Sequence, residues 1–89
     1  MAYLVVKQTV EDFDKWYKVF KSHEQAQKEA GLRDLQSLRG FSDNNIVVCI
    51  FRVDNLEKAQ AFTRAPEAGE AKLESGIVGE PEVLWLNEM

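Results

Sequence analysis

The sequence predicts an α+β domain whose elements follow the order β-α-β-β-α-β. Three apolar runs, at residues 4–6, 46–51 and 83–86, have the length and the β-branched or aromatic content typical of strands. One amphipathic stretch follows the first run and another follows the second, as two helices would require. No repeat, linker or low-complexity segment divides the 89 residues, so we expect a single domain over residues 1–89.

The first strand and the first helix are predicted from residues 3–31. Residues 3–10 are rich in β-branched side chains, and Glu11 and Asp12 then supply the negative charge that a helix N-terminus favours. A helix is therefore expected to begin near Glu11. Its inward stripe has the spacing i, i+3, i+4 and i+7 and consists of Phe13, Trp16, Tyr17 and Phe20. The pattern predicts one helix that continues to Gly31, where glycine can adopt a left-handed terminating conformation.

A β-hairpin is expected after this helix. Residues 32–41 alternate loosely between apolar and polar side chains and predict a half-buried strand at the edge of a sheet. Four turn-forming residues, Ser42-Asp43-Asn44-Asn45, separate them from residues 46–53, which are the strongest strand in the chain.

The second helix is expected to begin at Asp54, because Asp54 and Glu57 have the spacing of a capping box. Its apolar face is narrower than that of the first helix and consists of Leu56, Ala59 and Phe62. The pattern breaks near Ala65-Pro66.

A short helical segment and a last strand complete the predicted order. Proline is favoured in the first turn of a helix, so a segment over residues 67–75 is expected, ended by Gly76. Gly79 and Pro81 predict a loop, and residues 82–86 predict the last strand.

The predicted strands are apolar on both faces. A strand with one face in water alternates apolar and polar residues, and residues 4–6, 46–51 and 83–86 do not alternate. In a ferredoxin-like β-α-β-β-α-β fold, right-handed crossovers place both helices on one face of a four-stranded antiparallel sheet. We therefore predict that the second face pairs with a copy of itself in a two-fold homodimer.

Charge and composition exclude several classes of protein. Fifteen acidic side chains against eleven Lys and Arg give a net charge of −4, which disfavours nucleic acid and anionic membranes. RNA-recognition domains share the element order, and Arg39-Gly40-Phe41 faintly resembles the start of their motif. However, Ser42-Asp43-Asn44-Asn45 follows where an aromatic-bearing strand should stand. No apolar run could cross a bilayer and no signal peptide is visible, so we expect a cytoplasmic protein.

His23 and Arg39 are the candidate catalytic residues. His23 is the only histidine and extends the stripe of Trp16 and Phe20, so it could act as a general base at a pocket margin. The alternative is a partly buried histidine bonded to a nearby backbone or carboxylate group. Arg39 shares the strand parity of Phe41 and could bind a ligand anion; its alternative is an ion pair with an acidic residue.

Large aromatic side chains are the candidate ligand-binding residues, since small-molecule sites are apolar cavities. The alternative is that they only fill the core, which a domain this small requires. The candidates are Trp16, Phe20, Phe41, Phe51 and Trp85. One histidine and one cysteine cannot form a zinc site, and Cys49 lies in an apolar run where a thiol behaves as a small hydrophobic group. We expect no metal and no cofactor.

Several segments together resemble small bacterial proteins of the dimeric α+β barrel superfamily. They are residues 10–16 (VEDFDKW), Phe20, His23, Ala30-Gly31, the hairpin from Leu38-Arg39-Gly40-Phe41 to Asp43-Asn44, Phe62, and residues 76–83 (GIVGEPEV). The chain looks most like the antibiotic biosynthesis monooxygenase-like and cyclase-like members. The resemblance implies two ferredoxin-like sheets paired into a barrel with the helices outside.

Two functions are carried forward from the sequence. The first is a homodimeric small-molecule-binding protein with an apolar pocket between its helices and its sheet. The second, which the resemblance implies, is a cofactor-independent monooxygenase or a cyclase acting on an aromatic or lactone-like substrate. In that enzyme His23 would be the base, and Arg39 would steady an enolate or carboxylate.

Overall fold

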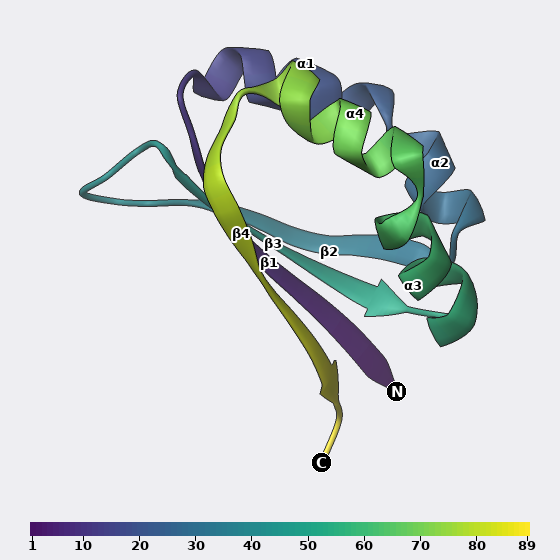
Figure 1. Ribbon diagram of the computed structural model, residues 1–89. Helices are drawn as coiled ribbons and strands as arrows, with labels where there is room; N and C mark the ends of the chain where they lie inside the picture. The colour runs from purple at the N-terminus through teal and green to yellow at the C-terminus, as the bar shows by residue number, and fades with distance from the viewer.

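The computed structural model describes residues 1–89, except for the side chains of residues 67, 68 and 71. Its elements run in the order β1 (Ala2–Val10), α1 (Phe13–Ser22), α2 (Glu24–Glu29), β2 (Leu32–Arg39), β3 (Ile46–Val53), α3 (Leu56–Arg64), α4 (Pro66–Ser75) and β4 (Ile77–Asn87). The four strands form one antiparallel sheet in the order β2-β3-β1-β4, and all the helices cover one face of it (Figure 1). The predicted α+β ferredoxin-like fold is confirmed. None of the helices in the described chain is long and apolar enough to span a membrane.

The core lies between the helices and the two central strands. Successive residues of β3 alternate between buried and half-buried, and the buried set is Val47, Cys49, Phe51 and Val53. Because β1 pairs with β3 so that Leu4 lies opposite Phe51, the buried side chains of both strands point to the helices. Trp16 of α1 and Ala59 of α3 close this core from above.

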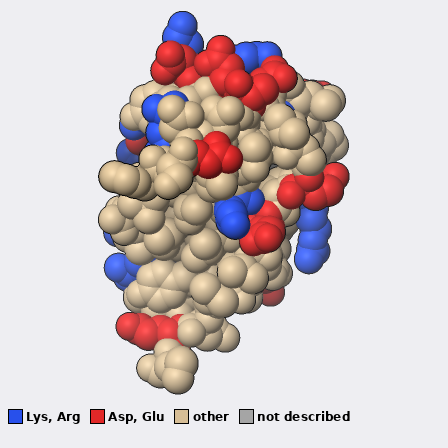
Figure 2. Space-filling view, turned by 90° about the vertical axis from the view of Figure 1, so that its left-hand side faces the viewer, with Lys and Arg blue, Asp and Glu red and all other residues tan. Residues whose placement is uncertain are grey.

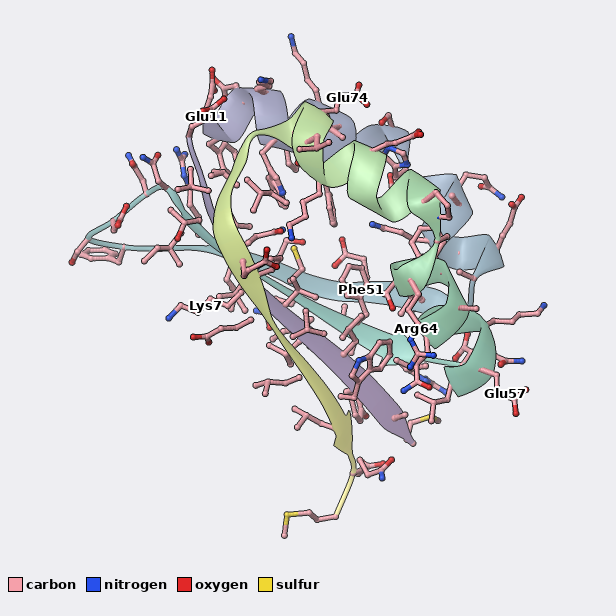
Figure 3. All side chains as sticks on the ribbon, in the orientation of Figure 1. Lys7, Glu11, Phe51, Glu57, Arg64 and Glu74 are labelled. Atoms are coloured by element: carbon pink, nitrogen blue, oxygen red, sulfur yellow. The ribbon has the colours of Figure 1, made fainter. Side chains whose placement is uncertain are left out.

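The other face of the sheet is largely apolar and has no helix over it in the described chain. Val5 lies opposite Ile50 on β3 and opposite Leu84 on β4, and Leu38 of β2 lies opposite Val48. Leu84 is 52% exposed. Figure 3 shows Lys7, on the same face, pointing away from the helices, and Figure 2 shows charged side chains gathered over the helices above a largely uncharged lower surface. We call this surface the free sheet face.

The first helical stretch is two helices, so the prediction of one helix to Gly31 was wrong. Asp12 caps α1 by accepting a hydrogen bond from the Lys15 N–H at 3.3 Å. Helix α1 ends at Ser22, whose hydroxyl donates to the Val19 carbonyl at 2.6 Å, a bond of the kind that often bends helices. His23 then has non-helical dihedrals, φ −99° and ψ 4°, and joins α1 to α2.

The predicted cap of the second helix was off by one residue. Asn55, not Asp54, caps α3 by accepting from the Lys58 N–H at 3.0 Å. The Asp54 N–H still bonds the Gly31 carbonyl, so Asp54 continues the strand geometry, and its carboxylate accepts from Arg33 at 2.7 Å.

The last strand is longer than predicted. It begins at Ile77, so Gly79 and Pro81 lie inside β4 and not in a loop. The sheet order explains this, because β4 is an edge strand and an edge strand tolerates a residue without an N–H. The β1–β4 register also shifts between Lys7 and Thr9, and Gly79 has a positive φ of 72°.

Two glycines, one inside α4 and one directly after it, should respond in opposite directions to alanine. Gly76 ends the helix with φ 74°, and a Cβ there would lie 2.8 Å from the Glu11 Oε1 atom. Gly76→Ala is expected to lower the free energy of unfolding by about 1–2 kcal/mol, because an L-residue is strained at this φ. Gly69 lies inside the helix with open space around its Cβ position, so Gly69→Ala should raise it by about 0.5–1 kcal/mol. Urea unfolding of both variants measures the difference, and equal signs would contradict this account.

Candidate functional site

A cavity of about 510 Å³ lies between the helices and the sheet. Helices α1 and α2 line one side of it, α3 and α4 line another, and β1 and β4 contribute side chains from the sheet. Most of its lining residues are apolar: Val6, Trp16, Val19, Phe20, Ala26, Phe62, Ala65, Ile77, Pro81 and Val83. Its size and lining are typical of a site for a small organic molecule. We call it the helix–sheet pocket.

Aromatic rings form one wall of the helix–sheet pocket. Trp16 is 3% exposed and stacks on Phe20, with 4.9 Å between ring centroids and 21° between ring planes. The Phe20 ring in turn lies 6.3 Å from Phe51, which projects between the sheet and the helices (Figure 3). Three of the predicted ligand-binding residues therefore form one cluster. Trp16 and Phe20 line the pocket, while Phe51 is a core residue that supports them.

His23 brings an imidazole to the pocket. It is half-buried at the junction of α1 and α2, where its backbone N–H donates to the Phe20 carbonyl and its carbonyl accepts from the Gln27 N–H. Its side chain does not cap α2. The helix junction therefore fixes the backbone of His23, which is one of the lining residues of the pocket.

The structure does not bring Arg39 and Phe41 to the pocket. The Arg39 guanidinium lies 3.9 Å from the centroid of the Phe13 ring, and its Nε donates to the Asn44 carbonyl at 2.7 Å. Arg39 thus fastens the hairpin to α1 through a cation–π contact, an outcome that neither sequence alternative anticipated. Strand β2 ends at Arg39, so Phe41 does not share its strand parity, and Phe41 is fully exposed in the hairpin loop.

Trp85 and Cys49 belong to the packing of the sheet. Trp85 lies opposite Leu4, is half-buried, packs against the core and is not a pocket-lining residue. Cys49 is 2% exposed, and burial raises the pKa of its thiol to about 12, with the nearby Asp34 carboxylate also raising it. The thiol therefore stays protonated at neutral pH.

Sequence reasoning missed part of the pocket lining. Lys72 of α4 and Gln8 of β1 both line it, and Ile77 and Pro81 were assigned to a loop. The apolar pair Ile77-Val78 directly after Gly76 was a signal of an earlier strand start. Among the described residues, no group of three or more His, Cys, Asp or Glu is gathered as a metal site would require.

The fold and the pocket define a class: a ferredoxin-like α+β protein with an apolar cavity under its helices. No protein-family model and no curated protein sequence matches the chain. Solved structures do match. A candidate antibiotic biosynthesis monooxygenase from Bordetella bronchiseptica superposes with a TM-score of 0.80 at 8% identity, covering 99% of this chain and 96% of that one.

Two further structures match over nearly the whole chain. A conserved protein from Methanosarcina mazei has a TM-score of 0.76 at 18% identity, covering 99% of this chain and 92% of that one. SnoaB, a cofactor-independent oxygenase from Streptomyces nogalater solved in a mutant form, has a TM-score of 0.76 at 15% identity, covering 98% of this chain and 91% of that one. Two of these three neighbours are named as a monooxygenase or an oxygenase, which agrees with the resemblance seen in the sequence, and the likeness is one of fold.

Proposed function

We propose that the protein binds a small, mostly apolar, ring-containing molecule in the helix–sheet pocket. The observation that carries this proposal is the cavity of about 510 Å³ with its apolar lining and its stacked wall of Trp16 and Phe20. Aromatic walls favour flat ligands, because offset stacking adds to the gain from burying apolar surface.

Filling the pocket should weaken this binding. Ala26 lies on α2 and lines the pocket, so Ala26→Phe should weaken the binding of 2-naphthamide at least about tenfold. Ala61→Phe is the matched control, because Ala61 is exposed on α3 and is not a lining residue. Calorimetry and quenching of tryptophan fluorescence measure the affinity. Equal affinities for both variants, or no binding to the unaltered protein, would contradict the proposal.

We also propose that the protein is a homodimer paired through the free sheet face. This face carries exposed or half-buried apolar side chains from all four strands, including Val5, Leu38, Ile50 and Leu84. A contiguous apolar surface of this kind is uncommon on monomeric proteins, and a two-fold contact would bury it in both copies at once.

A cofactor-independent oxygenase is the second candidate function. Its support is His23, which lines the same pocket as the aromatic wall, and the fold shared with the oxygenase SnoaB. In this reaction His23 would take a proton from an acidic C–H group of the substrate. The resulting carbanion would then give electrons to O₂, so that a CH₂ group and O₂ become C=O and H₂O. Arg39 is left out of this proposal because it lies against Phe13.

Oxygen uptake with an anthrone tests the enzymatic candidate. His23→Gln should lower the rate at least about 100-fold while 2-naphthamide still binds, because general-base catalysis contributes that much and Gln keeps a polar side chain of similar size. No uptake by the unaltered protein, or an unchanged rate in His23→Gln, would rule out this role.

A further inference from the structure

We propose that Lys72 makes the helix–sheet pocket selective for acidic ring-containing ligands, with aromatic carboxylates as the chemical class. This inference rests on the proposed binding function of that pocket and specifies which molecules it takes. Lys72 projects from α4, and its side chain lines the pocket together with His23 and the aromatic wall.

The charge of the pocket lining differs from that of the whole chain. The chain carries a net charge of −4. Among the side chains that the structure describes, however, no Asp or Glu lines the pocket, and Lys72 is its only Lys or Arg. Among the described lining side chains, a carboxylate entering the pocket therefore meets one cation, whose present partner is the Glu80 carboxylate. Apolar walls strengthen that attraction, because charges interact more strongly where water is displaced.

Lys72 lines the pocket and forms an ion pair with a carboxylate that a ligand can displace. Its Nζ lies 3.0 Å from the Glu80 Oε2 atom, so the pair bridges α4 and β4. The Lys72 side chain is 34% exposed and that of Glu80 is 91% exposed. An ion pair with such a solvated carboxylate contributes little net stability, because its acid gains almost as much from water. A ligand carboxylate can therefore displace Glu80 at low cost.

The local fold fixes the backbone from which the Lys72 side chain projects. The hydroxyl of Ser75, 4% exposed, donates to the Lys72 carbonyl at 3.1 Å and fixes the last turn of α4. The methylene stem of Lys72 can then lie along the apolar lining while its charged end meets the acid. This geometry fits a ligand with an apolar ring at Trp16 and Phe20 and an acidic substituent toward α4.

A pair of probes with the same ring separates charge from shape. The unaltered protein should bind 2-naphthoate about tenfold more tightly than 2-naphthamide, since a hydrogen bond to a charged group is worth about that factor. Lys72→Met should remove this preference, so that the ratio of the two affinities falls to about one. Glu80→Gln, which removes the competing carboxylate, should tighten 2-naphthoate a few-fold. Lys18→Met is the control, because Lys18 is an exposed cation on α1 that does not line the pocket.

The outcomes distinguish a failure of the Lys72 inference from a failure of the proposed binding function. If 2-naphthamide binds but 2-naphthoate binds no tighter, or if Lys72→Met keeps the preference for the acid, Lys72 is not the recognition group. If neither probe binds the unaltered protein, the proposed function fails as well. Thermal unfolding of each variant checks that the fold is retained, and the comparison of the two probes on the unaltered protein needs no variant.

Discussion

Replacing Phe51 by alanine is expected to lower the free energy of unfolding by about 3–5 kcal/mol. Phe51 is 4% exposed on the central strand β3, lies opposite Leu4 and contacts the ring of Phe20. Its removal leaves a cavity where the sheet meets α1, and the loss is a large part of the roughly 5–15 kcal/mol that stabilises a typical domain. Urea unfolding followed by circular dichroism measures the change.

Phe41→Ala is the matched control for this prediction. The two substitutions remove the same atoms, but Phe41 is fully exposed in the hairpin loop. We expect Phe41→Ala to change the free energy of unfolding by no more than about 0.5 kcal/mol. Comparable losses in both variants would mean that the Phe41 ring is buried in the assembled protein, for example against a second copy.

Leu84→Glu is expected to convert the proposed dimer to a monomer. Leu84 lies on the free sheet face beside Val5, and a two-fold contact would bury two added carboxylates for each dimer. Burying unpaired charge costs free energy, so we expect the dissociation constant of the dimer to rise at least about 100-fold. Sedimentation at micromolar concentration should give twice the 10.2 kDa chain mass for the unaltered protein and a single chain mass for the variant.

Leu73→Glu provides the control for charge alone. Leu73 is 85% exposed on α4, away from the free sheet face, so the same substitution there should leave the dimer intact. A single chain mass for the unaltered protein at these concentrations would overturn the dimer proposal. Dissociation by both variants would show that the interface is not specific to the sheet.

The strands and their order along the chain could be predicted because runs of apolar and β-branched residues are typical of strands. Residues 46–53 are apolar almost throughout, yet in the structure only every second residue reaches the helix-side core. The sequence pattern therefore correctly indicated a second apolar face. The predicted helical stripe likewise identified Phe13, Trp16 and Phe20 as side chains that pack on the core, because helical periodicity is a local property. Tyr17, the fourth member of the predicted stripe, is 41% exposed, so that part of the prediction was wrong.

The limits of the first helix and the composition of the pocket depended on contacts that are not local. The stripe continues in phase across His23, so periodicity could not reveal the break that separates α1 from α2. The contact between Arg39 and Phe13 was not predicted, because Phe13 lies 26 residues earlier in the chain and no local pattern joins the two residues. Nothing in the local sequence distinguishes Lys72 from the other lysines, because its place in the pocket depends on how the chain folds back from α4 to β4.

Alkylation of the buried Cys49 thiol measures how often the folded protein opens. Alkylating reagents attack only the thiolate. In the folded protein the Cys49 thiol is buried and its raised pKa keeps it protonated, whereas in the unfolded chain the thiol is exposed and has its ordinary reactivity. Since Cys49 lies in the core between a central strand and the helices, its exposure requires that core to open. The rate at which iodoacetamide alkylates Cys49 in the absence of denaturant therefore measures the equilibrium between closed and open molecules.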